Sequence, residues 1–374
     1  MKINICHITQ SAGGVENYIL NVIQHSNKQK FKHIVICFDN GNLATRAQKI
    51  GAKVVLIKMV REISIFKDVQ TILNIILYLK KNRPDIIYAH SAKGGVYGRV
   101  CGFILRIPVV FTPHAFSYLS QTGLKKKITL IIEKILSNHT FFLVPSSESE
   151  RDRAIFDVGW KRSNVLETYY NSITISKLKR IKKNNDEKII ISIARLTYQK
   201  NPLLFVDIAI RTIEKRRNTI FYLIGAGYTD EYSTIISNLI LKNKLENQII
   251  VLPWMDHDEI SNYLEKADIY LSTSRYEGLP TALLLAMDRE VPIVATNIDG
   301  NKDVVIHGET GFLSNSEDEL VKYIITLADT PSLCFDMGRK SKILLENKFD
   351  IRKNIEILEK IIYSVVIQNS NNNT

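Results

Sequence analysis

Residues 272–292 read STSRYEGLPTALLLAMDREVP, a pattern typical of a strand, a loop and a helix in succession. Residues 267–272 predict a strand, a polar loop follows, and Pro280 stands where a helix starting near Thr281 would be entered. Gly278 lets the backbone come close to a ligand. The first turn of such a helix can hold phosphate oxygens, and Glu277 can accept hydrogen bonds from ligand hydroxyls. Taken alone, the pattern also fits an ordinary turn with an exposed glutamate.

Outward from this stretch, short apolar runs alternate with amphipathic segments along almost the whole chain. Such alternation is typical of βαβ units and therefore of parallel sheets. Residues 176–188 (SKLKRIKKNNDEK) are polar and break the pattern into two series of similar size. We therefore predict an α/β protein with two Rossmann-like, doubly wound domains. The predicted strands are 3–8, 33–38, 53–57, 86–89, 109–112 and 141–144, then 189–193, 220–224, 249–252, 269–272 and 293–295, with helices such as 15–24, 65–81 and 125–136 between them.

The predicted domains follow from this division. A length of 374 residues suits two cores better than one. Ligands of open α/β sheets bind at the carboxyl ends of the strands, so the loops of both domains should surround one cleft. We expect an N-terminal domain at 1–175, a linker at 176–188, a C-terminal domain at 189–348, a helix at 349–368 that packs back toward the N-terminal domain, and a disordered tail at 369–374.

Composition excludes several classes of protein. The four cysteines are widely separated without a CxxC pair, which disfavours a zinc site or a disulfide framework and fits a reducing cytoplasm. Residues 1–8 read as a buried strand and not as a signal peptide. The longest apolar candidate for a membrane span, residues 63–79, is interrupted by charged and amide side chains. We expect a cytoplasmic protein.

The charge of the chain is unevenly distributed. Residues 1–175 carry 24 Lys and Arg against 11 Asp and Glu, whereas residues 176–374 carry 26 against 27. The excess on the first half indicates either an anionic partner or a solvated lysine-rich surface. Lys125-Lys126-Lys127 opens a stretch with apolar residues at helical spacing, 125–136. That stretch could rest on an anionic membrane, or its apolar side could be core.

Basic and glycine residues follow two predicted strands of the second half. Arg195 and Lys200 come after the strand at 189–193, and two cations at one strand end suit a diphosphate and its departure as a leaving group. Gly225 and Gly227 follow the strand at 220–224. This Gly-x-Gly is weak by itself, because a tight turn explains it as well as a ligand does.

In the first half, Gly13 and Gly14 follow the first strand and open a helix, with Glu16 two residues on. This glycine pair is not the GxGxxG fingerprint, which argues against a dehydrogenase. His90 and His114 each follow a predicted strand, within AHSAKGGVYGR and TPHAF. A single histidine is more often structural, but two at strand ends favour a functional site.

These motifs, in this order along nearly the whole chain, resemble the family-four glycosyltransferases. The members of this family are retaining enzymes of the GT-B fold. The chain resembles especially those of bacterial polysaccharide, capsule and O-antigen assembly. The resemblance implies that the first half binds the acceptor and the second half binds a nucleotide-diphosphate sugar, with a UDP-sugar favoured. The sugar would pass with retention of configuration to a glycan or lipid-linked acceptor. We expect no cofactor, no Asp-x-Asp metal site, no nucleic acid partner, and peripheral contact with the inner face of the cell membrane.

The resemblance also implies roles for individual residues. His114 would line the reaction centre, Glu277 would contact the donor sugar, and Arg195 and Lys200 would hold the diphosphate. The remaining donor contacts would be Gly13, Gly14, Glu16, Gly225, Gly227, Gly278, Leu279, Pro280, Thr281 and Leu285, and the acceptor side would include His90, Lys93 and Asn171, the last of these just before the hinge.

The sequence departs from the family pattern at three positions. Leu285 replaces the second glutamate, which normally accepts hydrogen bonds from the ribose, and Asp288 is a candidate to compensate for it. Glu290 replaces a glycine, and Asp303 stands where glutamate is frequent. Two other functions stay open. One is a different GT-B enzyme, such as a sugar-nucleotide epimerase or a phosphorylase, and the other is a degenerate, non-catalytic partner protein.

Overall fold

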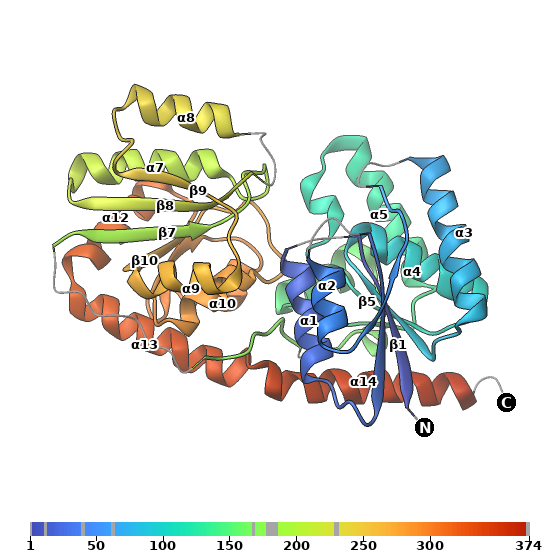
Figure 1. The fold of residues 1–374 in the computed structure, drawn as a ribbon. Helices are drawn as coiled ribbons and strands as arrows, with labels where there is room; N and C mark the ends of the chain where they lie inside the picture. Colours follow the sequence, from blue (N-terminus) through green and yellow to red (C-terminus); the bar gives the residue numbers. More distant parts are fainter. Residues whose placement is uncertain are drawn as a thin grey trace. The chain divides into compact units, whose positions relative to one another are not determined.

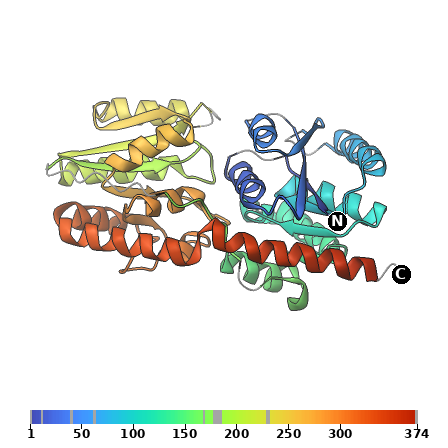
Figure 2. The same ribbon diagram turned by 60° about the horizontal axis from the view of Figure 1, so that its bottom comes forward.

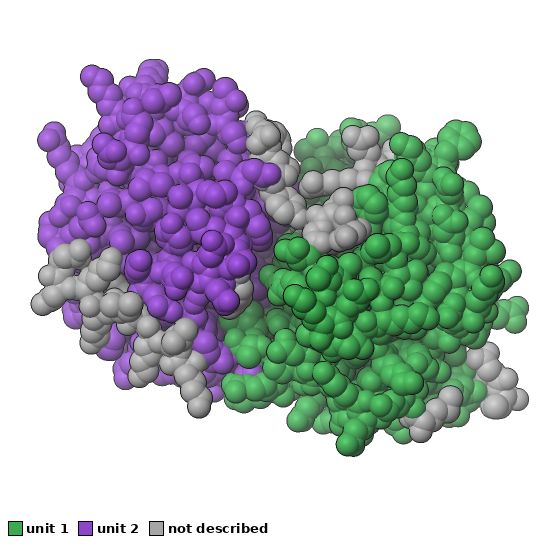
Figure 3. All heavy atoms as spheres, viewed as in Figure 1, with its two compact units in different colours: residues 1–174, 351–374 green, residues 175–350 purple. Residues whose placement is uncertain are grey.

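The computed structural model describes residues 2–10, 13–38, 42–60, 64–166, 169–176, 186–227 and 232–371. The chain forms two compact units, which Figure 3 colours separately. Unit 1 combines Met1–Thr174 with Ile351–Thr374, and unit 2 is Ile175–Asp350. Most of the predicted linker, residues 177–185, lies outside the described residues.

Unit 1 is built on a six-stranded parallel sheet with the order β3-β2-β1-β4-β5-β6. Figure 1 labels β1 and β5 of this sheet. Most residues of its strands are apolar and buried, because helices cover both faces of the sheet. The order reverses between β1 and β4, which is the position where doubly wound sheets bind ligands. The strands are β1 (Ile3–Ile8), β2 (Phe31–Cys37), β3 (Lys53–Leu56), β4 (Ile86–His90), β5 (Val109–Thr112) and β6 (Phe142–Leu143).

The helices of unit 1 form one layer on each face of this sheet. One core joins α1, α2 and α14 to the sheet, and another joins α3 and α4, with part of α5, to the opposite face. They are α1 (Gly14–His25), α2 (Leu43–Lys49), α3 (Ile65–Lys81), α4 (Ala92–Leu105), α5 (Gly123–Ser137), α6 (Glu148–Arg153) and α14 (Ile351–Asn371), with short turns of other helical types at Ser117–Ser120, Ala154–Val158 and Arg162–Asn164.

Helix α14 returns the chain to unit 1 after unit 2 is complete (Figure 2). Its buried residues Ile355, Leu358 and Ile362 belong to the same core as those of α1. The predicted disordered tail is wrong at residues 369–371, because α14 continues to Asn371. Residues 372–374 lie outside the described part of the chain.

Unit 2 repeats the architecture of unit 1 with the strand order β12-β11-β10-β7-β8-β9. Its order reverses between β7 and β10. The strands are β7 (Lys188–Ile193), β8 (Thr219–Ala226), β9 (Ile249–Pro253), β10 (Ile269–Ser272), β11 (Ile293–Thr296) and β12 (Gly311–Ser314), and the helices are α7 (Pro202–Lys215), α8 (Ser233–Lys242), α9 (His257–Lys266), α10 (Thr281–Asp288), α11 (Asn301–Val304), α12 (Glu317–Asp329) and α13 (Pro331–Lys348). The predicted α/β class with two doubly wound parallel sheets is confirmed.

Candidate active site

The loops that follow β7 and β10 lie side by side at the carboxyl edge of the unit 2 sheet. The Thr273 hydroxyl donates to the Lys200 carbonyl over 3.1 Å, and the Arg275 amide donates to the Gln199 carbonyl over 2.8 Å. The Gln199 side chain donates in turn to the Tyr276 carbonyl over 3.1 Å. These bonds fix the two loops to each other, so the side chains between them are held in place.

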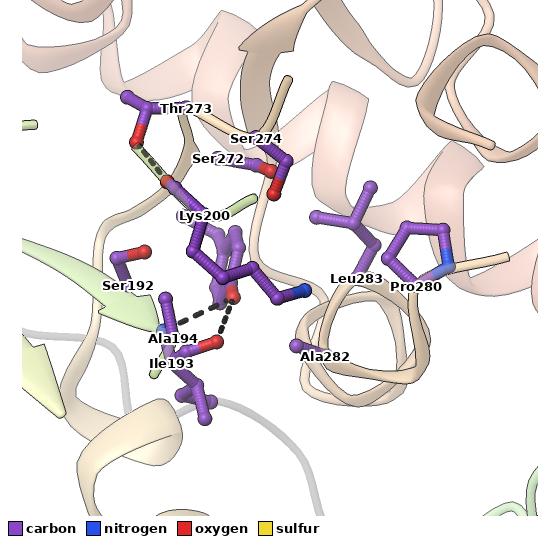
Figure 4. A pocket seen from close by; sticks show the side chains of 11 residues that line it. Ser192, Ile193, Ala194, Lys200, Ser272, Thr273, Ser274, Pro280, Ala282 and Leu283 are labelled. Carbon is purple, nitrogen blue, oxygen red and sulfur yellow. Dashed lines mark hydrogen bonds between the residues drawn. The ribbon is translucent and has the colours of Figure 1, made fainter. Parts of the chain in front are cut away.

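A pocket opens at this edge, between the ends of β7 and β10 and the start of α10 (Figure 4). Helix α10 begins at Thr281 after Pro280, as the sequence predicts. The first N–H groups of a helix have no carbonyl four residues earlier to donate to, which favours an anion at that end, although the Leu283 amide already donates to the Pro280 carbonyl over 3.0 Å. The lining residues are Ser192, Ile193, Ala194, Lys200, Tyr270, Ser272, Thr273, Ser274, Pro280, Ala282 and Leu283.

Lys200 and Glu277 form an ion pair in this region. The Lys200 ammonium lies 2.5 Å from Glu277 Oε1, and their side chains are 17% and 7% exposed. The Gln199 amide donates to the other carboxylate oxygen over 3.3 Å. An anionic ligand in the pocket would therefore compete with Glu277 for Lys200, whereas ligand hydroxyls would find Glu277 as an acceptor. Arg195 follows β7 as a half-buried residue, but it is not among the residues that line the pocket.

Glycines bring backbone segments together around this pocket. Gly225 has a φ of +139°, and a Cβ there would lie 2.3 Å from the Ala194 carbonyl oxygen, so this glycine serves a close backbone approach. Gly227 has a φ of +84°, and a Cβ there would meet no described atom within 4 Å. Gly300 was not predicted as a site residue from the sequence. A Cβ on Gly300 would lie 2.6 Å from the Glu277 Cβ and 2.9 Å from the Gly278 carbonyl oxygen, so Gly300 supports the Glu277 loop.

Asp303 has a local structural role at α11. Its carboxylate accepts from the Gly300 amide over 2.9 Å. Because Gly300 in turn packs on the Glu277 loop, Asp303 fixes the turn that supports this loop. Leu279, beside Gly278 in that loop, is buried, and Thr281 is half-buried.

The proposed compensation of Leu285 by Asp288 is wrong. The Asp288 carboxylate is buried, and its Oδ1 accepts from the Lys342 ammonium over 2.6 Å and from the Ser176 amide over 3.1 Å. Its other oxygen pairs with Arg289. These contacts commit Asp288 to packing between α10 and α13. Leu285 itself is half-buried on the second turn of α10 and does not line the pocket.

The backbone at Glu290 accounts for the glycine that the family has there. Glu290 adopts a φ of +55°, which favours glycine over any residue with a side chain. Its carbonyl oxygen faces Gly338 of α13, where an added Cβ would lie 1.9 Å away. The departure at Glu290 is therefore a matter of backbone strain and packing.

Several predicted residues of the first half lie at the carboxyl edge of the unit 1 sheet. Gly13 caps α1 with a φ of +79°, and no described atom lies within 4 Å of the position its Cβ would take. Glu16 is buried and lies 3.7 Å from an Arg46 nitrogen. Lys93, at the start of α4, pairs with Asp68 over 2.8 Å. Gly14 is exposed as the first residue of α1.

His90 and His114 come together at this edge and belong to a longer chain of histidines. His90 Nδ1 lies 3.2 Å from His114 Nε2. On its other side, His90 Nε2 lies 3.1 Å from His7 Nδ1, and His7 Nε2 lies 3.0 Å from His33 Nδ1. His7 and His33 were not predicted as site residues from the sequence, and they lie inside β1 and β2.

The four rings are held neutral by burial. Desolvation lowers the pKa of His33 to about 4 and the pKa of His114 to about 3. The same cause holds the pKa values of His7 and His90 well below the usual range, with a further contribution from the neighbouring histidines. At neutral pH each ring therefore offers one N–H donor and one acceptor.

The backbone is strained where β4 and β5 end. Ser91, His114 and Ala115 have positive φ values of 60°, 53° and 80°. A positive φ costs free energy at residues other than glycine, and such residues are concentrated at functional sites. Glu150, which was also not predicted from the sequence, holds this turn: its buried carboxylate accepts from the Ala115 amide over 2.6 Å and from the amide of Ser146 over 2.6 Å.

Asn171 is buried next to the same segment, since its backbone amide donates to the Ser146 carbonyl over 3.0 Å. The structure therefore brings His90, His114 and Asn171 to one edge of unit 1. Arg195, Lys200 and Glu277 gather at the corresponding edge of unit 2.

One Asp-x-Asp triplet, Asp256-His257-Asp258, does occur, contrary to the expectation from the sequence. Asp256 is the N-cap of α9, and its carboxylate accepts from the amides of Asp258 and Glu259, each over 3.0 Å. Glu259 accepts from the Asp256 amide in return, over 3.1 Å. This reciprocal capping box gives the first aspartate of the triplet a structural role.

Comparison with known proteins defines the class. Residues 12–170 match the family profile described as Glycosyltransferase Family 4, and residues 175–343 match that of Glycosyl transferases group 1. The chain is a glycosyltransferase of the GT-B fold, and it belongs to the family-four glycosyltransferases of bacterial polysaccharide biosynthesis. The predicted family is confirmed.

The relatives include glycosyltransferases named for capsular polysaccharide and O-antigen biosynthesis. One is the UDP-Gal:alpha-D-GlcNAc-diphosphoundecaprenol alpha-1,3-galactosyltransferase of Escherichia coli, 25% identical over 98% of both chains. Another is the capsular polysaccharide biosynthesis glycosyltransferase CapM of Staphylococcus aureus, 26% identical over 84% of this chain and 86% of that one. Among solved structures, HepE of Anabaena in complex with UDP and glucose matches with a TM-score of 0.83 at 19% identity, covering 97% of this chain and all of that one.

Proposed function

We propose that the protein transfers a sugar, with retention of configuration, from a UDP-sugar to a lipid-linked glycan. The observation that carries the donor assignment is the pocket at the ends of β7 and β10. There Lys200 and the first turn of α10 face one small space. A cation and a helix N-terminus together suit the diphosphate of a nucleotide sugar. The solved relative HepE, which holds UDP, supports the choice of nucleotide.

The proposed chemistry follows from these groups. As the bond between the anomeric carbon and the diphosphate breaks, negative charge grows on the leaving phosphate. Lys200, Arg195 and the N–H groups of α10 would stabilise that charge, and enzymes commonly gain more of their rate from such electrostatic stabilisation than from any other single effect. Glu277 would orient the sugar through its hydroxyls. We assign no nucleophile, because the family-type mechanism passes through an oxocarbenium-like state on one face of the sugar.

Product analysis tests the reaction class. The protein is incubated with a UDP-sugar, with and without an undecaprenyl-diphosphate-linked sugar, and the products are identified by mass spectrometry and by the anomeric coupling in NMR. We expect a glycosylated acceptor whose new linkage keeps the α configuration of the donor. An altered donor in the absence of acceptor would identify an epimerase, and inversion would overturn the retaining mechanism.

We propose further that unit 1 rests on an anionic membrane, where a lipid-linked acceptor would be found. The apolar side of α5 is not core, because Ile128, Ile131 and Ile135 are exposed and α5 buries only Glu133 and Leu136. Helices α3 and α4 cover the same face of the sheet. Their exposed apolar residues are Ile65, Phe66, Val69, Leu73 and Leu77 on α3, and Phe103 and Ile104 on α4.

The charges on this helical layer favour anionic lipid. Lys125, Lys126 and Lys127 stand at the start of α5. The two acidic side chains in α3 and α5 are both paired, Asp68 with Lys93 and Glu133 with the fully buried Arg99. Each basic residue near an anionic surface contributes about 1 kcal/mol, and exposed apolar side chains add to it. None of the helices in the described ranges is both long and apolar enough to span a bilayer.

Vesicle co-sedimentation tests the membrane contact. We expect binding to vesicles with anionic phospholipid, and little binding to vesicles of phosphatidylcholine alone. The variant with Lys125, Lys126 and Lys127 all changed to Glu should lose this binding. The matched control changes three unit 2 lysines, Lys242, Lys244 and Lys266, to Glu and should bind like the native protein. Equal loss in both variants would mean that net charge alone is responsible, and the proposed surface would be wrong.

A further inference from the structure

The hydrogen bonds along the chain of four histidines can run in either of two directions. Three N···N contacts of 3.0 to 3.2 Å link the rings in the order His33, His7, His90, His114. Adjacent ring centroids lie 5.3 to 5.5 Å apart, with interplanar angles of 12° to 28°. Each contact needs one N–H and one lone pair, and each neutral ring has one of each. All three bonds must therefore point the same way.

The buried end of the chain selects the direction. His33 Nε2 is buried and has no hydrogen-bond partner among the described residues. If the bonds ran toward His33, this atom would be a buried N–H without an acceptor, which is rare in proteins. If they run toward His114, the same atom is an unpaired acceptor, which is tolerated more often. The second arrangement places the proton of every ring on Nδ1.

We infer that His33, His7 and His90 are positioning residues that fix His114 as the Nδ1–H tautomer, so that His114 offers a hydrogen-bond donor at the carboxyl edge of the unit 1 sheet. His90 Nδ1–H donates to His114 Nε2, which leaves the proton of His114 on its other nitrogen. The backbone of the same turn is fixed independently, by the bond from the Ala115 amide to Glu150. A neighbour that sets the tautomer of a ring also sets its orientation.

Tyr18 supports this arrangement from helix α1. Its ring packs edge-on against His114 at 4.8 Å and against His90 at 5.8 Å between centroids. Its hydroxyl does not enter the histidine chain, because it lies 2.5 Å from the Tyr88 hydroxyl and donates to the Tyr169 hydroxyl over 3.1 Å. The imidazoles are therefore hydrogen-bonded to one another and flanked by aromatic carbon.

The kinetic consequence rests on the proposed function. A donor fixed at His114 before the substrates arrive would lower the barrier to transfer, while the nucleotide would be held by unit 2. Loss of the tautomer should therefore lower kcat and leave the KM for the UDP-sugar nearly unchanged.

The test begins with the tautomers of the native protein, which need no activity. The full chain, which has eight histidines, is labelled with 15N at histidine, and long-range 1H–15N correlations are recorded at pH 7. We expect all four rings of the chain to carry the proton on Nδ1. An Nε2–H tautomer at His90 or His114 would overturn the inference even if the enzyme proves active.

Two variants of His90 then separate positioning from packing. His90→Gln keeps an N–H donor group and a carbonyl acceptor on the side chain, whereas His90→Phe fills the space without either. We expect His114 to stay in the Nδ1–H form in His90→Gln, because the hydrogen bond to its Nε2 is kept. The kcat should then stay within about fivefold of native, since loss of one hydrogen bond costs roughly tenfold in rate. His90→Phe should lose the single tautomer and at least about tenfold in kcat. Phe as active as native, with Gln inactive, would show that packing alone matters.

Discussion

Replacing Lys200 with alanine removes the cation on which the proposed donor site depends, and its effect has two separable parts. The first is on stability. Glu277 is 7% exposed and would lose its partner at 2.5 Å, which leaves the Gln199 amide as a weaker donor to the carboxylate. Breaking a buried pair costs about 3–5 kcal/mol, and the 17% exposure of Lys200 brings the expected loss to about 2–3 kcal/mol.

The second part is on catalysis. Loss of one charged group from the leaving diphosphate should remove about 2–4 kcal/mol of transition-state stabilisation, which is roughly 30- to 1000-fold in kcat/KM. Urea unfolding measures the first part, and initial rates with a UDP-sugar and acceptor measure the second.

The double variant Lys200→Ala, Glu277→Gln distinguishes the two effects. A neutral glutamine no longer needs the cation, so the free energy of unfolding should return to within about 1 kcal/mol of the native value. Activity should stay low, because the diphosphate still lacks Lys200. If the double variant instead regained near-native kcat/KM, Lys200 would serve only to neutralise Glu277 and would not hold the diphosphate.

Three other changes have definite expected outcomes. Leu285→Glu should tighten UDP binding by about tenfold or more in calorimetry, since it restores a charged acceptor for the ribose; an unchanged Kd would mean that this turn of α10 does not face the nucleotide. Glu290→Gly should raise the free energy of unfolding by up to about 1 kcal/mol, because glycine adopts a φ of +55° without strain. Glu290→Ala should not raise it. Equal free energies for the two variants would show that this backbone is not strained. The native pKa values of His33 and His114, about 4 and about 3, lie below the roughly 6.5 of an unfolded histidine, so protons favour the unfolded chain. Urea unfolding should show about 2 kcal/mol less stability per ring at pH 5 than at pH 7, and a smaller loss in His33→Gln; the same loss in both proteins would show that acid acts elsewhere.

The sequence was sufficient for the architecture because its signals are local. Continuous apolar runs mark strands buried on both faces, and most predicted strands lie within a few residues of those in the structure. The strand β12 (Gly311–Ser314) was not predicted, because it has only two apolar residues and is defined by its pairing with β11. The start of α10 was predicted correctly because Pro280 is a strong local signal.

The site could be predicted only in part, because its supporting contacts join residues far apart in the chain. The roles of Glu150 and Gly300 arise from the distant Ala115 and Glu277 that they touch. His7 and His33 lie inside strands and do not follow them. A polar residue within an apolar run was the signal that could have indicated them. The ion pair of Asp288 with Lys342 could not be predicted, because the two residues lie 54 positions apart in the sequence.

The proposed binding of the donor nucleotide at the carboxyl ends of β7 and β10 can be tested by hydrogen–deuterium exchange of the native protein with and without UDP. With UDP we expect slower exchange of backbone amides at 192–200 and 272–283, since these segments surround the pocket. With uridine, which lacks the diphosphate, we expect no such protection at the same concentration. Protection by UDP confined to unit 1, or equal protection by uridine, would show that the diphosphate does not bind at the ends of β7 and β10.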